Sequence, residues 1–449
     1  MDSDLFGTAG VRGPVADAVT PSLALRVGRA AAEAADGAPF VVGRDGRVTG
    51  DALVSALAAG LQSGGAPVTR VGQVPTPALA FASRGRRGAM LTASHNPPAD
   101  NGIKLFVDGV EYDRDAEESV ETAVAADPDP ADWDAWTSAD RADVLGDYRE
   151  AVVDFAAGHG ADPDGLPVVA DCGNGAASLA VPQVLTSLGA EVTALNANLD
   201  GHFPGRESKP TAESLDDCRA FVADSDAALG LAHDGDADRI VVLDGDGEIV
   251  HEDTIVAVLA HHYVAASDAA DPMVVTTPNA SARIDDRVEA AGGRTERVRL
   301  GGLHEGVAAA EGTVVFAAEP WKHIHTAFGG WMDGVVSAAV LVRLVAAAGS
   351  VDALRDPVRE LPYRKVNVAC ADERKAAAMA AVPGELASAF PDAAFDESYG
   401  VRATRPDGSW VLVRPSGTEP YLRIYAEGED VEAIVDAARG AVETAVDRA

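Results

Sequence analysis

The sequence predicts a protein of the α/β class, with three α/β units followed by an α+β unit. A chain of 449 residues exceeds what one hydrophobic core usually serves, so two to four domains are expected. Before about residue 360, short apolar runs alternate with Ala-rich stretches, which predicts mainly parallel sheets covered by helices. Beyond residue 360, several strands surround one long helix, which is typical of α+β. We therefore predict domains over residues 1–145, 146–250, 251–357 and 358–449.

Local patterns predict the elements of the first two units. In the first unit we expect helices at 22–27 and 51–62 and strands at 40–43 and near 67–71. The Asp-, Pro- and Trp-containing stretch 127–140 is expected to be a linker or a surface loop. In the second unit we expect strands at 166–171, 190–195 and 227–231, with a Gly-Asn-Gly turn at 173–175.

The last two units differ in the order of their elements. The third is expected to hold a helix at 253–266 and strands at 273–277, 295–298 and 313–317. The fourth is expected to hold strands at 365–368, 410–414 and 422–426, together with a long Ala-rich helix and a closing helix. The similar strand–helix order of the first three units suggests related domains.

The charge of the chain limits its partners. The formal net charge is −35, which fits a surface that stays hydrated in concentrated salt, where screening shortens self-repulsion. The negative electrostatic potential of such a surface would repel nucleic acid and anionic membranes, so we expect neither as a partner. A site for an anionic ligand must therefore be a local basic cluster, formed mainly by arginine. The chain has only five lysines: Lys104, Lys209, Lys322, Lys365 and Lys375.

Cysteine usage and the N-terminal residues indicate the compartment. Cys172, Cys218 and Cys370 have unrelated spacings, so they suggest neither a disulfide framework nor a metal pair. The N-terminal residues lack a basic segment followed by an apolar one, and no apolar run approaches the ~20 residues of a membrane span. We expect a cytoplasmic protein.

The run Thr92-Ala93-Ser94-His95-Asn96-Pro97-Pro98 predicts a reactive serine in a tight loop. A serine hydroxyl is a weak nucleophile unless a neighbour takes its proton or holds charge, and His95 and Lys104 are close in sequence. The prolines fix the backbone away from helix. Such a loop suits a group that accepts and returns a phosphoryl, although an ordinary polar loop is the alternative for this run alone.

The run Asp234-Gly235-Asp236-Ala237-Asp238-Arg239 predicts a site for a hard cation. Its three carboxylates alternate with small residues between two apolar strands, so they can converge on one ion. The loop follows a strand of an α/β sheet, where ligands usually bind. Gly245 stands where an EF-hand would need glutamate, and the nearby residues 244–247 predict a hairpin turn without function.

Two further loops are rich in glycine or hydroxyl side chains. Arg414-Pro415-Ser416-Gly417-Thr418-Glu419-Pro420 joins two predicted strands, and its guanidinium, hydroxyls and amides can hold phosphate. An ordinary hairpin is the alternative. The N-terminal run 6–13, F-G-T-A-G-V-R-G, is a second glycine-rich turn that carries a single basic residue, Arg12.

Together these motifs resemble the α-D-phosphohexomutase superfamily of phosphoglucomutases, phosphomannomutases and phosphoglucosamine mutases. The likeness spans the chain, and the motifs occur in the family's order: F-G-T-x-G-x-R-G, T-A-S-H-N-P, D-G-D-x-D-R and R-x-S-G-T-E-P. The resemblance implies four domains around a central cleft, three of them related α/β domains with mixed sheets and the last α+β. It also implies Mg²⁺ as cofactor and a sugar bisphosphate as intermediate.

The resemblance assigns roles residue by residue. Ser94 is expected to be the phosphoserine and, with Asp234, Asp236 and Asp238, a ligand of Mg²⁺. The catalytic set that it implies is Ser94, His95, Lys104, Arg12 and His323. The substrate-binding set is Arg239, Glu319, Trp321, Lys322, His323, Arg414, Ser416, Gly417, Thr418 and Arg423.

One loop departs from the family. The sugar-recognition signature G-E-x-S-G-H is matched here by Ala318-Glu319-Pro320-Trp321-Lys322-His323, so Trp321 and Lys322 replace a Ser-Gly pair. Glu319 can still accept hydrogen bonds from sugar hydroxyls, and Trp321 is predicted to stack on a sugar ring. A surface loop changed by drift is the alternative.

The implied reaction interconverts sugar 1- and 6-phosphates, with glucose, mannose or glucosamine as the sugar. Lys104 and His323 would exchange protons with the reacting hydroxyls. A phosphoglucosamine or phosphopentose specialisation is the alternative within the family. A Ser94-dependent sugar phosphatase and a non-catalytic sugar-phosphate sensor are the alternatives outside it. We expect small sugar phosphates as ligands, neither nucleic acid nor a membrane as a partner, and a monomer or a homodimer.

Overall fold

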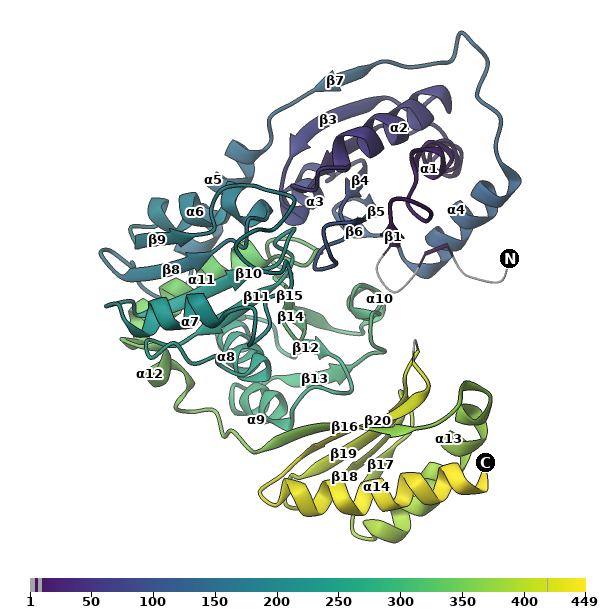
Figure 1. Ribbon diagram of the computed structural model, residues 1–449. Helices are drawn as coiled ribbons and strands as arrows, with labels where there is room; N and C mark the ends of the chain where they lie inside the picture. The colour runs from purple at the N-terminus through teal and green to yellow at the C-terminus, as the bar shows by residue number, and fades with distance from the viewer. Residues whose placement is uncertain (1–4, 7–9, 418) are drawn as a thin grey trace. The chain divides into compact units, whose positions relative to one another are not determined.

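The computed structural model describes residues 5–6, 10–417 and 419–449 (Figure 1). Its contacts divide the chain into two compact units. The first comprises Met1–Ile255 with Trp321–Asp356, and the second comprises Val256–Pro320 with Pro357–Ala449. Four sheets with helices make up these units, three in α/β arrangements and one in an α+β arrangement, which confirms the predicted fold class. The four predicted domain ranges stay a prediction.

The first sheet of unit one has the strand order β1-β5-β4-β2-β3-β7, with β6 paired to β5. Strands β2, β3, β4 and β7 run parallel, whereas β5 is antiparallel to β4 and to β1, so the sheet is mixed. Its elements are β1 (Val11–Pro14), α1 (Pro21–Ala34), β2 (Phe40–Arg44), α2 (Gly50–Ser63), β3 (Val68–Gln73), α3 (Thr76–Ala82), β4 (Arg87–Leu91), β5 (Asp100–Val107), β6 (Val110–Glu111), α4 (Arg114–Ala126) and β7 (Ala139–Arg141).

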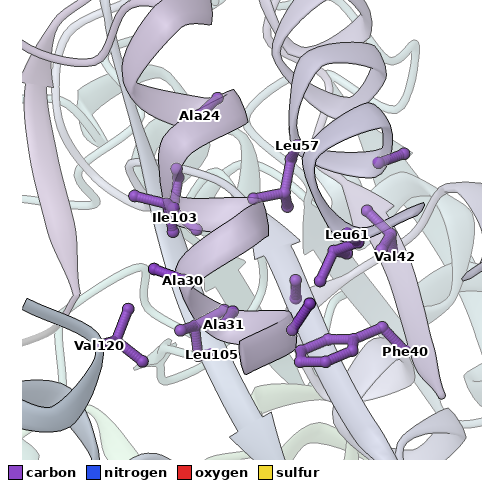
Figure 2. Close-up of a cluster of buried hydrophobic side chains, with 14 of the residues drawn as sticks. Ala24, Ala30, Ala31, Phe40, Val42, Leu57, Leu61, Ile103, Leu105 and Val120 are labelled. Atoms are coloured by element: carbon purple, nitrogen blue, oxygen red, sulfur yellow. The ribbon is translucent and has the colours of Figure 1, made fainter. Parts of the chain in front are cut away.

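Close helix packing covers this sheet. Helix α1 begins at Pro21 after Thr20, whose side chain accepts a hydrogen bond from the Leu23 amide and so caps the helix. A Cβ at Gly60 would lie 2.2 Å from the Leu25 carbonyl, so only glycine lets α1 and α2 approach this closely. Figure 2 shows the result, a buried cluster to which α1, α2 and the strands beneath them contribute apolar side chains.

The second sheet of unit one has the order β11-β10-β8-β9. Strands β8, β9 and β10 are parallel, and β11 returns antiparallel to β10 as a hairpin. Helix α11 is buried along most of its length and packs against α5 and α6. The remaining elements of this unit are α5 (Leu145–Ala157), β8 (Pro167–Asp171), η1 (Ala176–Leu179), α6 (Val181–Ser187), β9 (Glu191–Leu195), α7 (Asp216–Ala223), β10 (Leu229–His233), β11 (Ile240–Leu243), β15 (Lys322–Ile324), α11 (Gly334–Ala348) and α12 (Val351–Arg355).

Unit two contains a parallel layer and an antiparallel sheet. In the parallel layer, β12 pairs with β13 and with β14. The antiparallel sheet has the order β16-β20-β19-β18-β17, and α13 and α14 pack against each other and bury a large apolar cluster. Helix α8 (Glu252–Ala265) begins in unit one. The elements of unit two are β12 (Pro272–Thr276), α9 (Ala282–Ala290), β13 (Arg294–Arg297), α10 (Leu303–Ala309), β14 (Thr313–Glu319), β16 (Tyr363–Ala369), α13 (Asp372–Ala389), β17 (Ala394–Asp396), β18 (Val401–Thr404), β19 (Trp410–Pro415), β20 (Tyr421–Glu427) and α14 (Val431–Arg448).

Most predicted elements are confirmed. The strand expected at 227–231 is wrong by two residues, since β10 starts at Leu229. The stretch expected as linker or loop, 127–140, exposes 87 % of Trp133, and its last residues belong to the edge strand β7.

All three cysteines are free and buried. Within the described part of the chain, no helix is both long and apolar enough to cross a membrane.

Candidate active site

The aspartate loop connects β10 to β11 and gathers three buried carboxylates. Asp234, Asp236 and Asp238 are each at most 1 % exposed, and one oxygen from each lies within 4.8 Å of the others. The loop forms as predicted at the carboxyl end of β10, a strand parallel to β8. Asp236 accepts a 2.6 Å hydrogen bond from the Thr76 hydroxyl at the start of α3. The hairpin turn predicted at 244–247 also forms, around a hydrogen bond from the Gly247 amide to the Asp244 carbonyl.

The serine loop connects β4 to β5 and brings Ser94 to the aspartate loop. The Ser94 hydroxyl donates a 2.6 Å hydrogen bond to Oδ2 of Asp234, and Nδ1 of His95 lies 3.4 Å from the same hydroxyl. Ser94 is fully buried and adopts a positive φ of 50°, a conformation that residues other than glycine rarely take. The structure therefore brings together the two loops that the sequence singled out.

Basic side chains surround these groups. Lys104 lies on β5 and forms ion pairs with Asp238 at 3.0 Å and Glu111 at 3.2 Å. Arg12 on β1 lies in register with Gly102 on β5, and its buried Nε and Nη2 atoms have no hydrogen-bond partner among the described residues. Arg239 places Nε 3.8 Å from Asp234 and 3.7 Å from Asp238. Three of the predicted basic residues thus converge on the serine and aspartate loops.

The protonation of the site follows from burial and from these charges. Burial would lower the pKa of Lys104, but Asp238, Glu111 and Asp236 outweigh it and raise that pKa, so Lys104 stays an ammonium. Burial and the neighbouring Arg239 lower the pKa of His95 to about 3, so its imidazole is neutral. For Asp238, Lys104 and other cations outweigh burial and hold the pKa well below its usual range.

The pKa of Asp234 reflects the repulsion among the three carboxylates. Burial and the two neighbouring carboxylates raise its pKa well above the usual range, because three negative charges cannot share so small a volume. Oδ1 of Asp236 and Oδ1 of Asp238 are buried and have no hydrogen-bond partner among the described residues. One oxygen of each carboxylate lies within 4.8 Å of the others, and carboxylate oxygens are the ligands that a hard divalent cation takes. The donor set fits a hard divalent cation.

The sugar-loop residues of unit one are mostly buried. Trp321 has a φ of 67°, accepts a hydrogen bond from the Ile240 amide at 3.0 Å, and packs its side chain against the apolar cluster beneath β10 and β11. Lys322 is 7 % exposed, and its charge lowers the pKa values of Asp238 and His95. Trp321 is thus partly engaged in packing, whereas Lys322 adds a cation to the serine and aspartate loops. Sequence reasoning gave Lys322 no such position.

His323 lies deeper than its predicted role suggests. It is 2 % exposed, its Nδ1 lies 2.9 Å from the Ser337 hydroxyl, and burial lowers its pKa to about 3. In this conformation the imidazole is neutral and contacts α11. Glu319 is the last residue of β14 and belongs to unit two.

The phosphate loop of unit two connects β19 to β20, as predicted. Arg414 and Arg423 lie directly opposite each other across the antiparallel pair, a like-charge arrangement that an anion would stabilise. Ser416 accepts a hydrogen bond from the Glu419 amide, and the Lys375 ammonium donates to the carbonyls of Ser416 and Glu419 at 2.7 and 2.6 Å. Gly417 has open space where a side chain would stand. Thr418 lies outside the described residues.

Sequence reasoning missed the residues that support the serine loop. Asp45 and Arg47, between β2 and α2, are fully buried and form an ion pair. Arg47 donates to the Ser94 carbonyl, and Asp45 accepts from the Thr92 hydroxyl. Asp45 and Arg47 belong to the run Arg-Asp-Gly-Arg at 44–47, which directly follows the strand predicted at 40–43. This position was the signal that could have identified them. A strand end in an α/β sheet is a usual place for functional side chains.

Comparison with known proteins agrees with this fold. Four family models described as phosphoglucomutase/phosphomannomutase match in order: α/β/α domain I over residues 3–130, domain II over 147–247, domain III over 251–361 and the C-terminal domain over 366–442. The chain therefore belongs to the phosphoglucomutase/phosphomannomutase family of the α-D-phosphohexomutase superfamily. Enzymes of this family are isomerase-class phosphomutases, and so is this chain.

Individual relatives cover nearly the whole chain. It is 41 % identical to a phosphopentomutase of Thermococcus kodakarensis, over 94 % of this chain and 93 % of that protein. It is 39 % identical to a protein named probable phosphoglucosamine mutase of Methanopyrus kandleri, over 95 % of this chain and 94 % of the relative. A crystal structure of a phosphoglucomutase/phosphomannomutase family protein from Burkholderia thailandensis matches with a TM-score of 0.86 at 25 % identity, covering 99 % of this chain and 98 % of that one.

Proposed function

We propose that the enzyme interconverts sugar 1- and 6-phosphates through a phosphoserine at Ser94 and a sugar bisphosphate intermediate. The observation that carries the proposal is the 2.6 Å contact between the Ser94 hydroxyl and Asp234, within a buried set of three carboxylates. A hydroxyl in this position can carry a phosphoryl group whose charge is balanced by nearby cations. An ordinary polar loop would not bury its serine among the carboxylates of a second loop.

Asp234, Asp236 and Asp238 would hold Mg²⁺, which when bound would neutralise negative charge on the transferring phosphoryl group. Arg12 and Arg239 would contact phosphoryl oxygens. Transfer breaks the P–Oγ bond of phospho-Ser94 and forms a P–O bond to a sugar hydroxyl oxygen, so the sugar hydroxyl gives up a proton and Oγ takes one up. The neutral imidazole of His95 lies 3.4 Å from Oγ, so it would accept the Ser94 hydroxyl proton in the return step, when Oγ takes a phosphoryl group back from the bisphosphate.

The proton-exchange roles of Lys104 and His323 receive less support. Lys104 is held as an ammonium by three carboxylates, so it would donate hydrogen bonds to oxygens rather than accept a proton. His323 contacts Ser337 inside the protein and would need to move to reach a substrate. We propose that Lys104 stabilises charge on the transferring phosphoryl group and that His95 exchanges the proton of Oγ.

The second phosphate of the substrate would bind at the loop between β19 and β20. Arg414 and Arg423 provide two guanidinium groups side by side, and guanidinium binds phosphate through paired hydrogen bonds. A second phosphate-binding loop suits a mutase, since the bisphosphate must bind in two orientations. A phosphatase that uses water as acceptor does not need it.

The substrates we propose are hexose phosphates, with glucose, mannose or glucosamine as the sugar. A phosphopentose is the second candidate, because the T. kodakarensis relative at 41 % identity is a phosphopentomutase. The exchange of a Ser-Gly pair for Trp321 and Lys322 in the sugar loop is consistent with a change of sugar.

Incubation with Mg²⁺ and the 1-phosphates of glucose, mannose, glucosamine and ribose tests the proposal. Isomerised ester is the expected product. Free phosphate would indicate a phosphatase, and no turnover of any sugar would overturn the proposal. Ser94→Ala should abolish turnover and remove the phosphorylated peptide from the mass spectrum. The matched control is Ser388→Ala, because that exposed serine only contacts the Gly384 carbonyl of its own helix.

A further inference from the structure

Arg47 uses every donor of its guanidinium on the serine loop and its support. Nη2 donates to the carbonyls of Ser94 at 2.8 Å and Asn96 at 2.7 Å, and Nη1 donates to those of Pro97 at 2.5 Å and Asp100 at 2.9 Å. The fifth donor, Nε, contacts Oδ2 of Asp45 at 3.1 Å. An arginine has five N–H donors in a fixed plane, so the geometry of four carbonyls is set by one rigid group.

Asp45 and Thr92 complete the support. Asp45 accepts from the Arg47 amide at 2.9 Å and from the Thr92 hydroxyl at 2.7 Å. The Thr92 hydroxyl in turn accepts a 2.8 Å hydrogen bond from the Ser94 amide. All three side chains are fully buried. The network therefore starts at Asp45 and reaches Ser94 by two separate routes.

Both backbone polar groups of Ser94 are thus bound, the amide by Thr92 and the carbonyl by Arg47. This holds the residue at its φ of 50°, a conformation that costs free energy in a residue other than glycine and persists only where the surroundings impose it. With the backbone fixed, the side-chain rotamer alone decides where Oγ lies. In the observed rotamer, Oγ contacts Asp234.

We propose that Arg47 and Thr92 are positioning residues for phosphoryl transfer, which hold the backbone of Ser94 so that Oγ stays aligned with the aspartate loop. The inference rests on the proposed role of Ser94 as phosphoryl carrier. Neither residue touches the reacting atoms. Their contribution is orientation, and a misplacement of about 1 Å at a reacting group can reduce a rate ~10²-fold.

The first test is Arg47→Lys. Lysine keeps the charge but has three donors on a flexible stem, so it cannot bind four carbonyls. We expect kcat to fall about 10²-fold with little change in the KM for sugar phosphate. The matched control is Arg343→Lys, because Arg343 is a buried arginine that donates to the carbonyls of His159 and Ala157 and forms an ion pair with Asp162. The control should lose thermal stability but keep its kcat per folded molecule.

The second test uses Thr92, and it tests the positioning role even if Arg47→Lys does not fold. Thr92→Val replaces the hydroxyl by a methyl group of similar size, and Thr92→Ser restores it. We expect Thr92→Val to lower kcat roughly 10-fold or more, since the Ser94 amide loses its partner, and Thr92→Ser to recover most of the loss. A role limited to stability would lower the Tm of Thr92→Val and leave kcat unchanged.

The outcomes separate this inference from the proposed function. If wild type turns over through phospho-Ser94, as mass spectrometry would show, while Arg47→Lys and Thr92→Val keep wild-type kcat, the positioning role is wrong and the proposed function stands. If wild type isomerises sugar phosphates without phosphorylated Ser94, both are wrong. A selective fall in kcat for both variants, with the Arg343→Lys control unchanged, supports the inference.

Discussion

The Ser94 hydroxyl lies 2.6 Å from Oδ2 of Asp234, although 140 residues separate the two in the chain. The contact joins loops that leave different sheets, one between β4 and β5 and the other between β10 and β11. The hydroxyl acts as donor to a carboxylate that already shares its surroundings with two others. The neighbouring charges therefore influence the protonation of both Ser94 and Asp234. Single substitutions can alter these charges one at a time.

Removal of one negative charge from the aspartate loop should weaken Mg²⁺ binding. Asp236→Asn keeps an acceptor for the Thr76 hydroxyl but leaves two carboxylates in place of three. Because affinity for hard cations follows ligand charge, we expect a dissociation constant for Mg²⁺ raised roughly 10-fold or more. Without Mg²⁺, the variant should unfold at the same temperature as wild type or higher, since repulsion falls.

Thermal unfolding against MgCl₂ concentration measures this effect without relying on catalysis. A ligand that binds only the folded state raises its stability in proportion to the logarithm of concentration over Kd, so the rise should be smaller for Asp236→Asn. Asp246→Asn is the matched control, because Asp246 is exposed in the nearby hairpin turn. Equal Mg²⁺ affinity in wild type and Asp236→Asn would contradict the metal assignment.

The two loops also meet through their backbones at Gly235. A Cβ added to Gly235 would lie 2.7 Å from the Ser94 carbonyl oxygen, so alanine must push the loops apart. We expect Gly235→Ala to reduce kcat by on the order of 10²-fold, because Oγ and the carboxylates lose their alignment. Steady-state kinetics of this variant and of Gly146→Ala, where a Cβ meets open space, would check it. Full activity in Gly235→Ala would show that the loops need not lie this close.

The serine and aspartate runs could be recognised from the sequence, whereas the position of Arg47 could not. The aspartate run and the serine run were recognisable because their chemistry is concentrated in a few adjacent positions. The support from Arg47 was not, since its four carbonyl partners come from the backbone of residues 94–100 and leave no pattern of side chains. The position of Lys322 near Asp238 had no sequence signal for a related reason, because its charge reaches Asp238 only through tertiary folding.

The fold was predicted more fully than the site. Apolar runs predicted β2, β3, β8 and β9 close to their observed bounds. Strands β2 and β8 are buried and almost wholly apolar, as expected for strands of a covered parallel sheet. Strand β5 was missed, because its polar start at Asp100 and Asn101 follows two prolines. That strand carries Lys104, so its pairing with β1, which brings Arg12 alongside Gly102, could not be foreseen either.

Asp333 should make stability depend on pH. It caps α11 by accepting from the amides of Val335 and Val336, and it also accepts from Tyr148 and Trp331. Burial nevertheless raises its pKa from 3.8 to about 6, against the effect of these donors. A raised pKa means that the folded state holds the proton more tightly than the unfolded state, so this contribution is complete below about pH 4 and is lost as pH rises through about 6.

Comparison of wild type with Asp333→Asn isolates that effect, because asparagine does not titrate. The free energies of unfolding of the two proteins differ by two contributions. The altered hydrogen bonds contribute a constant difference, and the titration of Asp333 in wild type contributes a difference that changes with pH. From pH 4 to pH 7 the free energy of unfolding of wild type should fall relative to the variant by up to about 3 kcal/mol, which corresponds to a pKa shift of about 2. Urea unfolding at several pH values measures it, and parallel curves for the two proteins would contradict the raised pKa.

Salt should stabilise the whole chain. A formal net charge of −35 on 449 residues repels itself in dilute buffer, and at 1 M salt the screening length falls to about 3 Å. We therefore expect Tm to rise continuously between 0.1 and 3 M KCl. The chloride salt of tetramethylammonium at equal concentrations is a control for specific binding of K⁺, since it supplies the same ionic strength with a bulkier cation. A Tm that stays level or falls over this range would show that repulsion within the acidic surface does not limit stability.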